Sequence, residues 1–218
     1  MTIAATAAEA FERYQRAFEA QALIQGNWRK EQDGRQLACA LGVIGDEVTS
    51  PNDCPAAVMP RWLARMVPWF FDRQKAADAY DWGLRFYAEL KRIDGQVPFS
   101  VVHDWHATVT TEMAIEVAKK LNKDPAPHVA MQNLHKRALA GETISESEWH
   151  RVLKPAYAHA YAHAYAYAYA DADAHAHADA HAYAYAYADA HADAHAYAHA
   201  MKRLADGMVD CLKRVPGR

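Results

Sequence analysis

The spacing of apolar side chains predicts helices through most of the first 154 residues. Near the start of the chain, Phe11, Tyr14 and Phe18 recur at helical intervals. They follow Thr6 and Glu9, which have the spacing of a capping box, in which each side chain bonds the backbone of the other residue. The pattern predicts a first helix that begins near residue 6 and ends before the next glycine.

Several further stretches carry the same period. The expected helices are 60–68, 74–92, one that begins at Ser100 and extends through Val117, 128–141, and a last one that Ser145 and Glu148 open as a second capping box. Proline favours the first helical position and disfavours the interior, so Pro60 is expected to begin its helix and Pro68 to end it. The run LACALGVI (37–44) is consistent with a buried strand or a buried helical turn, and its period does not distinguish them.

From residue 156 to residue 200, every second position is alanine and the positions between are only Tyr, His or Asp. Strict alternation is typical of a strand, but this segment contains no Gly, Pro, Asn or Ser that would favour a turn. Strands rarely exceed about ten residues, and alanine is the best helix former. The segment, called the alanine repeat below, is therefore predicted to be helical.

These elements define an all-α protein: a compact multi-helix core followed by one long Ala-rich C-terminal helix. The expected domains are 1–154, the helical core, and 155–218, the repeat helix with a terminal helical segment. Six tryptophans, all before the repeat, are expected to anchor the core, because large aromatic side chains dominate burial.

A helix with a two-residue repeat places its large side chains on every side. Each seam then offers large side chains beside shallow alanine positions, so two such helices can approach closely and interdigitate. We expect homo-oligomers formed through the repeat, with tyrosines at the interface: Tyr165, Tyr167, Tyr169, Tyr183, Tyr185 and Tyr187. Two alternatives remain open: the helix packs only onto its own core, or it is a solvated spacer.

The charge distribution excludes a broad nucleic-acid-binding surface. The chain carries a net charge of −3, and the repeat holds five Asp and no Lys or Arg, so the remainder is close to neutral. A signal peptide and an 18-residue apolar run are both absent from the sequence. The three cysteines lack zinc-site spacing. We expect a cytoplasmic protein with reduced thiols and no membrane or nucleic-acid partner.

Histidines one helical turn apart in the repeat are candidate ligands for Zn²⁺ or Ni²⁺. The residues are His177, His181, His191, His195 and His199. Adventitious metal binding and a plain structural role are the alternatives, and the leading expectation is that no cofactor is bound. Because unperturbed histidine titrates near pH 6.5, packing against the repeat is also expected to weaken below about pH 6.

A second candidate site lies in the segment VVHDWHATVTTE. It places His103, Asp104, His106 and Glu112 within three turns, as a metal or acid–base site requires. Capping and surface polarity are the alternative explanation. The chain contains none of the sequence motifs of serine hydrolases, P-loop enzymes, zinc proteases or dinucleotide-binding enzymes. Without a nearby histidine, Cys39 and Cys54 are interpreted as buried thiols.

Three stretches resemble a group of uncharacterised bacterial and phage or prophage proteins: 33–72 with its CALG and CPAxxMPxWLA segments, 137–152, and 199–215. The resemblance covers about two-thirds of the chain. It implies a helical, alanine-rich region with Tyr and Asp, although the strict alternation and abundant His depart from the group's pattern. The group has no established activity, so the resemblance assigns no catalytic residue.

Together these features predict a non-enzymatic phage or prophage accessory protein that acts by binding and self-associates through the repeat. Its target would be a host-defence protein or a small ligand. The alternative is a metal-binding protein or metal-dependent enzyme that uses the clustered His and Asp side chains, so whether the protein is an enzyme stays open.

Overall fold

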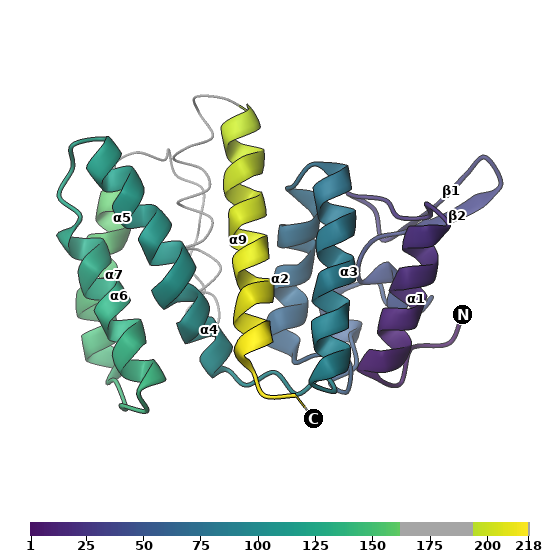
Figure 1. Cartoon of the computed structure of the whole chain (residues 1–218), viewed down its shortest axis with the longest axis horizontal. Helices are drawn as coiled ribbons and strands as arrows, with labels where there is room; N and C mark the ends of the chain where they lie inside the picture. Colours follow the sequence, from purple (N-terminus) through teal and green to yellow (C-terminus); the bar gives the residue numbers. More distant parts are fainter. Residues whose placement is uncertain (162–193, 218) are drawn as a thin grey trace. The chain divides into compact units, whose positions relative to one another are not determined.

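The computed structural model describes residues 1–161 and 194–217 and is predominantly helical (Figure 1). This confirms the helical class of the prediction. One long helix through the repeat is not confirmed, because the last described helix, α9, comprises Ala194–Arg214, and residues 162–193 lie outside the described part. The chain divides into two compact units: Met1–Pro98 with Met208–Arg218, and Phe99–Gly207. The domain boundary expected at residue 154 stays a prediction, since most of the repeat that defines it is not described.

The first unit contains three complete helices, the last part of α9, a β-hairpin and two short 3₁₀ turns. The elements are α1 (Ala7–Glu19), β1 (Arg29–Gln32), β2 (Arg35–Ala38), η1 (Gly42–Ile44), η2 (Pro51–Asp53), α2 (Arg61–Asp72) and α3 (Ala76–Arg92). Helices α1 and α3 pack against each other and lie side by side in Figure 1.

Helix α1 begins after the predicted N-cap, Thr6, but Glu9 bonds the backbone of Ala5 rather than that of Thr6. The Thr6 side chain accepts a hydrogen bond of 3.2 Å from the Glu9 backbone N–H, and a Glu9 carboxylate oxygen accepts one of 2.9 Å from the Ala5 N–H. Because the first N–H groups of a helix have no partner within the helix, these two bonds fix where α1 starts.

Helix α2 does not end at Pro68, so that expectation was wrong. It continues to Asp72 with Pro68 in its interior. Proline inside a helix costs about 3 kcal/mol because it removes a backbone hydrogen bond and crowds the preceding turn. The residues beyond it, Phe70 and Phe71, are both fully buried, and burying such a side chain contributes about 1.5–3 kcal/mol. Burial of this final turn offsets the cost of the proline.

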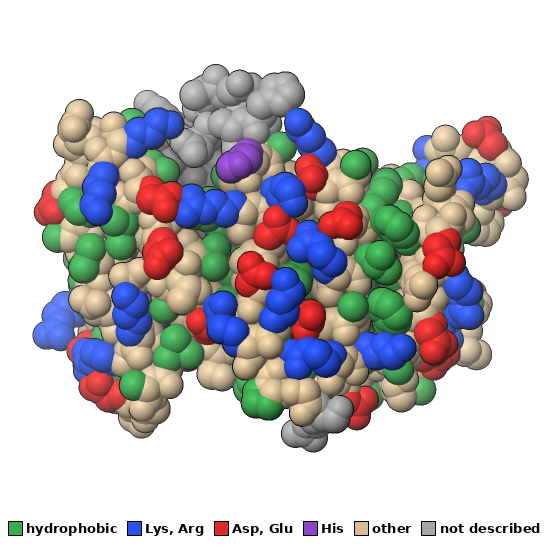
Figure 2. Space-filling view, viewed as in Figure 1, with side chains coloured by type: hydrophobic (Ala, Val, Ile, Leu, Met, Phe, Trp, Pro, Cys, Tyr) green, Lys and Arg blue, Asp and Glu red, His purple; other side chains and the backbone are tan. Residues whose placement is uncertain are grey.

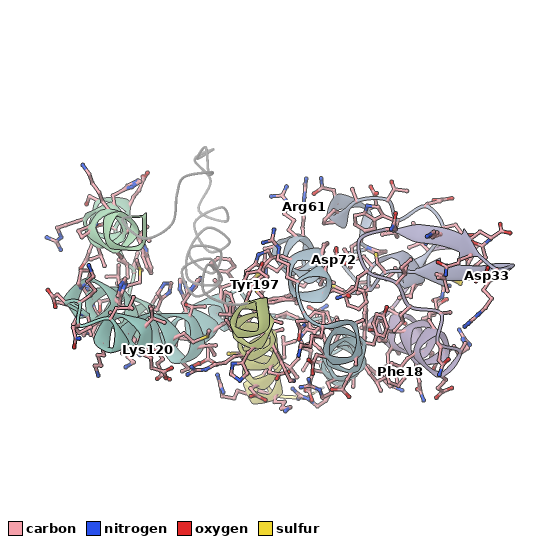
Figure 3. The ribbon with its side chains drawn as sticks, turned by 90° about the horizontal axis from the view of Figure 1, so that it is seen from above. Phe18, Asp33, Arg61, Asp72, Lys120 and Tyr197 are labelled. Atoms are coloured by element: carbon pink, nitrogen blue, oxygen red, sulfur yellow. The ribbon has the colours of Figure 1, made fainter. Side chains whose placement is uncertain are left out.

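The antiparallel hairpin of β1 and β2 is absent from the all-helical prediction. Asp33 and Gly34 connect its strands with φ values of 53° and 69°. Positive φ at both central residues is the requirement of a type I′ turn, which Asp-Gly favours. Figure 3 places Asp33 at the outer end of this hairpin. The LACALGVI run is divided between the end of β2 and η1, so it forms neither one strand nor one helix.

Aromatic rings fill the core of the first unit. Tyr14 of α1 stacks on Tyr87 of α3 with ring centroids 5.0 Å apart, and Trp82 stacks on Phe86 at 4.8 Å. All four side chains are fully buried. A Cβ atom at Gly83 would lie 2.1 Å from the Tyr14 hydroxyl oxygen, so α1 approaches α3 as closely as this glycine allows.

The second unit is built around a central helix, α6. Its elements are α4 (Ser100–Trp105), the π-helical turn η3 (His106–Thr110), α5 (Thr111–Lys120), α6 (Ala126–Leu139), α7 (Glu146–Tyr161) and the first part of α9. Elements α4, η3, α5 and α7 each pack against α6. The predicted cap of α7 is confirmed, because the Glu148 N–H donates to the Ser145 hydroxyl at 3.3 Å.

The α9 segment in this unit is held by two polar contacts. The buried indole N–H of Trp105 donates to the Leu204 carbonyl at 2.9 Å, and Arg203 forms an ion pair with Glu116 of α5. Within the described residues, no helix combines the length and the hydropathy needed to cross a bilayer. Figure 2 shows acidic and basic side chains interspersed on the visible face, without a field of one sign.

Candidate functional site

Three histidines and one tryptophan of the second unit come together from four different elements. His103 belongs to α4, His106 to η3, His135 to α6 and Trp149 to α7. His106 and His135 are buried, with 3% and 8% of their surface exposed, whereas His103 is half-buried. We call these four residues the histidine cluster.

The closest contact in the cluster joins His103 and His135 through their Nδ1 atoms, which lie 3.0 Å apart. The two ring centroids are 5.3 Å apart. This is about the largest centroid distance that the short Nδ1–Nδ1 separation allows, so the two Nδ1 atoms lie between the rings and point at each other. At this distance one nitrogen carries the proton and donates it to the lone pair of the other. The two neutral rings are therefore opposite tautomers.

His106 packs face to face with His135 and is held by a threonine. The two ring centroids are 4.5 Å apart with an interplanar angle of 25°. The Nδ1 atom of His106 lies 2.8 Å from the Thr110 hydroxyl oxygen. The backbone carbonyl of His106 accepts a 2.6 Å hydrogen bond from the Thr111 hydroxyl, within the wide π-turn that starts at His106. Such turns occur frequently at functional sites.

Aromatic side chains hold the His103 ring in place. Trp149 stacks on it with a centroid distance of 5.8 Å and an interplanar angle of 13°, and Phe99 meets it edge-on at 5.6 Å. Phe99 is 40% exposed, so the aromatic surroundings of His103 reach the surface. Burial lowers the pKa of His103 below its ordinary value of 6.5, because the charged imidazolium loses hydration.

The structure brings together only part of the site predicted in this segment. His103 and His106 lie in one cluster, but they meet through His135, which the prediction did not include. Glu112 lies on α5 and is exposed, and the Asp104 carbonyl accepts a hydrogen bond from the Thr108 hydroxyl at 2.8 Å. Within the described residues, no group of three or more His, Cys, Asp or Glu side chains is placed to hold a metal ion.

Two members of the cluster, His135 and Trp149, had no signal of function in the sequence. For His135, the sequence feature that could have indicated burial is its position one helical turn after Met131, on the face of α6 that is buried. Met131 packs with Leu153 and Ala156 of α7, and Trp149 lies against this group.

Most candidate residues of the alanine repeat lie outside the described part of the chain. These are His177, His181, His191 and the six tyrosines at 165, 167, 169, 183, 185 and 187. His195 lies in α9, and only its backbone is described. His199, also in α9, is exposed.

The three cysteines are buried free thiols in the first unit. Burial raises the pKa of Cys39, and it raises the pKa of Cys54 to about 12. Because the thiolate is the nucleophilic form, these two side chains are held unreactive at neutral pH.

Comparison with protein-family models, curated proteins and solved structures found no match to this chain. The histidine cluster is therefore interpreted from its own geometry. The Nδ1 atoms of its three histidines are engaged with each other or with a hydroxyl group, and its rings join four elements of the second unit.

Proposed function

We propose that this protein acts by binding and that it self-associates through the alanine repeat. The observation that carries the proposal is the conformation of the two ends of the repeat. Residues 156–161 continue α7, and residues 194–200 begin α9. Both described ends are helical, which supports a helix rather than a strand for the segment between them.

Two alanines at these ends occupy closely packed positions, and a third, Ala198, is half-buried. Ala156 is fully buried and Ala200 is 4% exposed, whereas Tyr197 is half-buried and His199 is exposed. Small residues allow helices to approach closely, and the larger side chains beside them then fill the space of a facing helix. Extended across the repeat, this arrangement gives a surface suited to a second copy of the same helix.

The test is native mass spectrometry of the untagged protein, purified without chelator or added metal. We expect a dimer or a larger species. Replacing the six repeat tyrosines (165, 167, 169, 183, 185 and 187) by alanine should yield a monomer, because it removes the rings proposed to interdigitate. The matched control replaces the same six by phenylalanine, which keeps the rings and should keep the assembly. A monomeric wild-type protein would contradict the proposal.

The same spectrum tests what the assembly binds. We propose a small ligand or a host-defence protein as the target, in line with the resemblance to phage and prophage proteins. A ligand retained by the assembly would appear as an excess mass of up to a few hundred daltons. The buried thiols support a reducing, cytoplasmic setting.

A second candidate function is metal binding by the repeat histidines, including metal-dependent catalysis. It is supported by the exposure of His199, which leaves this imidazole accessible at the described end of the repeat. Zinc or nickel retained at one equivalent per chain, and lost when His177, His181, His191, His195 and His199 are replaced by Asn, would establish it. A metal content unchanged by these replacements would exclude it.

A further inference from the structure

The head-on contact between His103 and His135 limits how many protons the pair can hold. In the neutral pair, one Nδ1 donates and the other accepts. One further proton can enter at the Nε2 of the donor ring and leave this hydrogen bond in place. A second would have to occupy the accepting Nδ1, which would set two N–H groups against each other between two cations. The closed pair therefore takes up at most one additional proton, whereas two separated imidazoles take up two.

The surroundings of the pair also favour its neutral form. His135 is 8% exposed, and the titratable group that packs on it from η3 is another buried imidazole, that of His106. From α7 the pair meets the neutral ring of Trp149. Burial accounts for the lowered pKa of His103, with no contribution from a neighbouring carboxylate.

Carboxylates on or next to the packed elements include Glu148 and Glu142, Glu116 and Glu112, and Asp104. On α7, Glu148 binds Arg137 of α6 at 2.6 Å, and Arg137 also binds Glu142. On α5, Glu116 pairs with Arg203 of α9, and Glu112 is exposed. Asp104 of α4 follows His103 directly in the chain and is half-buried. Within the described residues, none of these carboxylates forms a hydrogen bond or an ion pair with His103.

We propose that the His103–His135 contact is an acid-opened latch, which holds α4 against α6 while both rings are neutral and parts when the second unit is acidified. The contact joins two residues that lie 32 positions apart in the chain, on different helices. The chain between them does not hold the two helices together by itself once the contact breaks. Neither histidine of the latch belongs to the alanine repeat, so the proposal does not rest on self-association through it and is tested separately.

The direction and size of the effect follow from proton linkage. The pKa of His103 is lowered in the folded state, so the unfolded or opened state binds more protons at acidic pH. The stabilisation is fully present above about pH 6.5 and is lost as the pH falls below it. The opened state binds at least one more proton than the closed state at acidic pH. The equilibrium constant for opening should therefore increase about tenfold for each unit by which the pH falls below about 6.5.

The test is amide hydrogen exchange of the full chain, read by mass spectrometry on peptides from α4 and α6. Measurements between about pH 7.5 and about pH 5 are corrected for the intrinsic pH dependence of exchange. The double variant His103→Asn, His135→Asn places amide groups near the two Nδ1 positions, where they pair without titrating. His150→Asn is the matched control, because His150 lies on α7 and is exposed.

In the wild type and in the His150→Asn variant, the equilibrium constant for opening should rise about tenfold for each unit by which the pH falls. In the double variant this rise should be about tenfold smaller per unit. Equal slopes in the wild type and the double variant would overturn the latch. If the double variant does not fold, the single variant His103→Asn serves instead, because His135 can then be protonated without facing another imidazole. An unchanged slope in that variant would equally overturn the proposal.

Discussion

The two units of this protein use the same kind of helix but fill their interiors with different rings. The first unit packs Tyr14, Trp82, Phe86 and Tyr87, whereas the second brings histidines together beside Trp149. Burial raises the pKa of Tyr14 and of Tyr87 well above the ordinary range, so these hydroxyls stay neutral at any physiological pH. An imidazole, by contrast, has an ordinary pKa close to physiological pH, so a small change in pH changes its charge.

The difference shows that helical periodicity alone does not determine how a core responds to its solvent. Both units bury one face of each helix, but only the second places groups on that face whose charge changes between pH 5 and pH 8. The first unit should therefore respond mainly to packing changes, and the second to acid as well.

The largest expected effect concerns the cysteines, all three of which belong to the first unit. The pKa of Cys54 is raised from 9.0 to about 12, which lowers its thiolate fraction at pH 8 by about a thousandfold. Alkylation of the native protein should be slower than that of the denatured protein by about this factor at Cys54, as measured by peptide mass spectrometry. Native labelling at the denatured rate would show that this interior is open.

The next effect is a change in the free energy of unfolding on α3 that has the opposite sign from the one that helix propensity predicts. Helix propensity predicts that Gly83→Ala, in the helix interior, stabilises by about 1 kcal/mol, and that Ala77→Gly, exposed in the first turn, destabilises by less. The structure predicts that Gly83→Ala instead destabilises by about 1–3 kcal/mol, because the new Cβ meets the buried Tyr14 ring. Urea denaturation of the two variants measures both. A stabilised Gly83→Ala variant would contradict the close approach of α1 and α3.

A smaller loss is expected from removing one buried hydroxyl. The Tyr87 hydroxyl donates to the Ala40 carbonyl at 2.6 Å, so Tyr87→Phe leaves that carbonyl unpaired and costs about 1–2 kcal/mol. Neither partner titrates near neutrality, so the loss should be equal at about pH 7.5 and about pH 6. A loss that depends on pH in this interval would place a titrating group in the core of the first unit.

The smallest effects concern the two helix caps. Thr6→Ala in the first unit and Ser145→Ala in the second each remove an acceptor for a helical N–H and should cost about 1 kcal/mol. Hydrogen exchange of the first turns of α1 and α7 locates each loss. Serine at position 6 and threonine at position 145 are the conservative controls, and they should restore protection.

Local signals in the sequence predicted most helices because their causes are local. The N-caps at Thr6 and Ser145 were predicted correctly, since each cap lies three residues before the N–H that it accepts from. The reciprocal half of the predicted box at Thr6 was wrong, because the Glu9 carboxylate bonds the Ala5 N–H instead. The hairpin was missed although Asp33-Gly34 is a strong turn signal, because its strands are short, polar and largely exposed. Pro68 was misinterpreted because a local rule was outweighed by burial of the turn that follows it.

The candidate site was only partly predictable for the opposite reason. His103 and His106 are close in the sequence, so one segment suggested both. His135 reaches His103 across 32 positions, and Trp149 comes from a further helix. No short-range pattern encodes such contacts, which depend on how α4, α6 and α7 pack. Conversely, Glu112 was included because of its proximity in sequence, and the structure places it on an exposed face of α5.

The most direct test of the contrast between the two interiors is hydrogen exchange at the imidazole C2 position in the intact wild-type protein, followed across pH and assigned by peptide fragmentation. This measurement reports the protonation midpoint of each histidine without any substitution. The account predicts a midpoint for His103 below 6.5, the ordinary value for an imidazole, because the ring is partly buried. A midpoint for His103 at or above 6.5 would contradict the claim that the interior of the second unit favours neutral histidine.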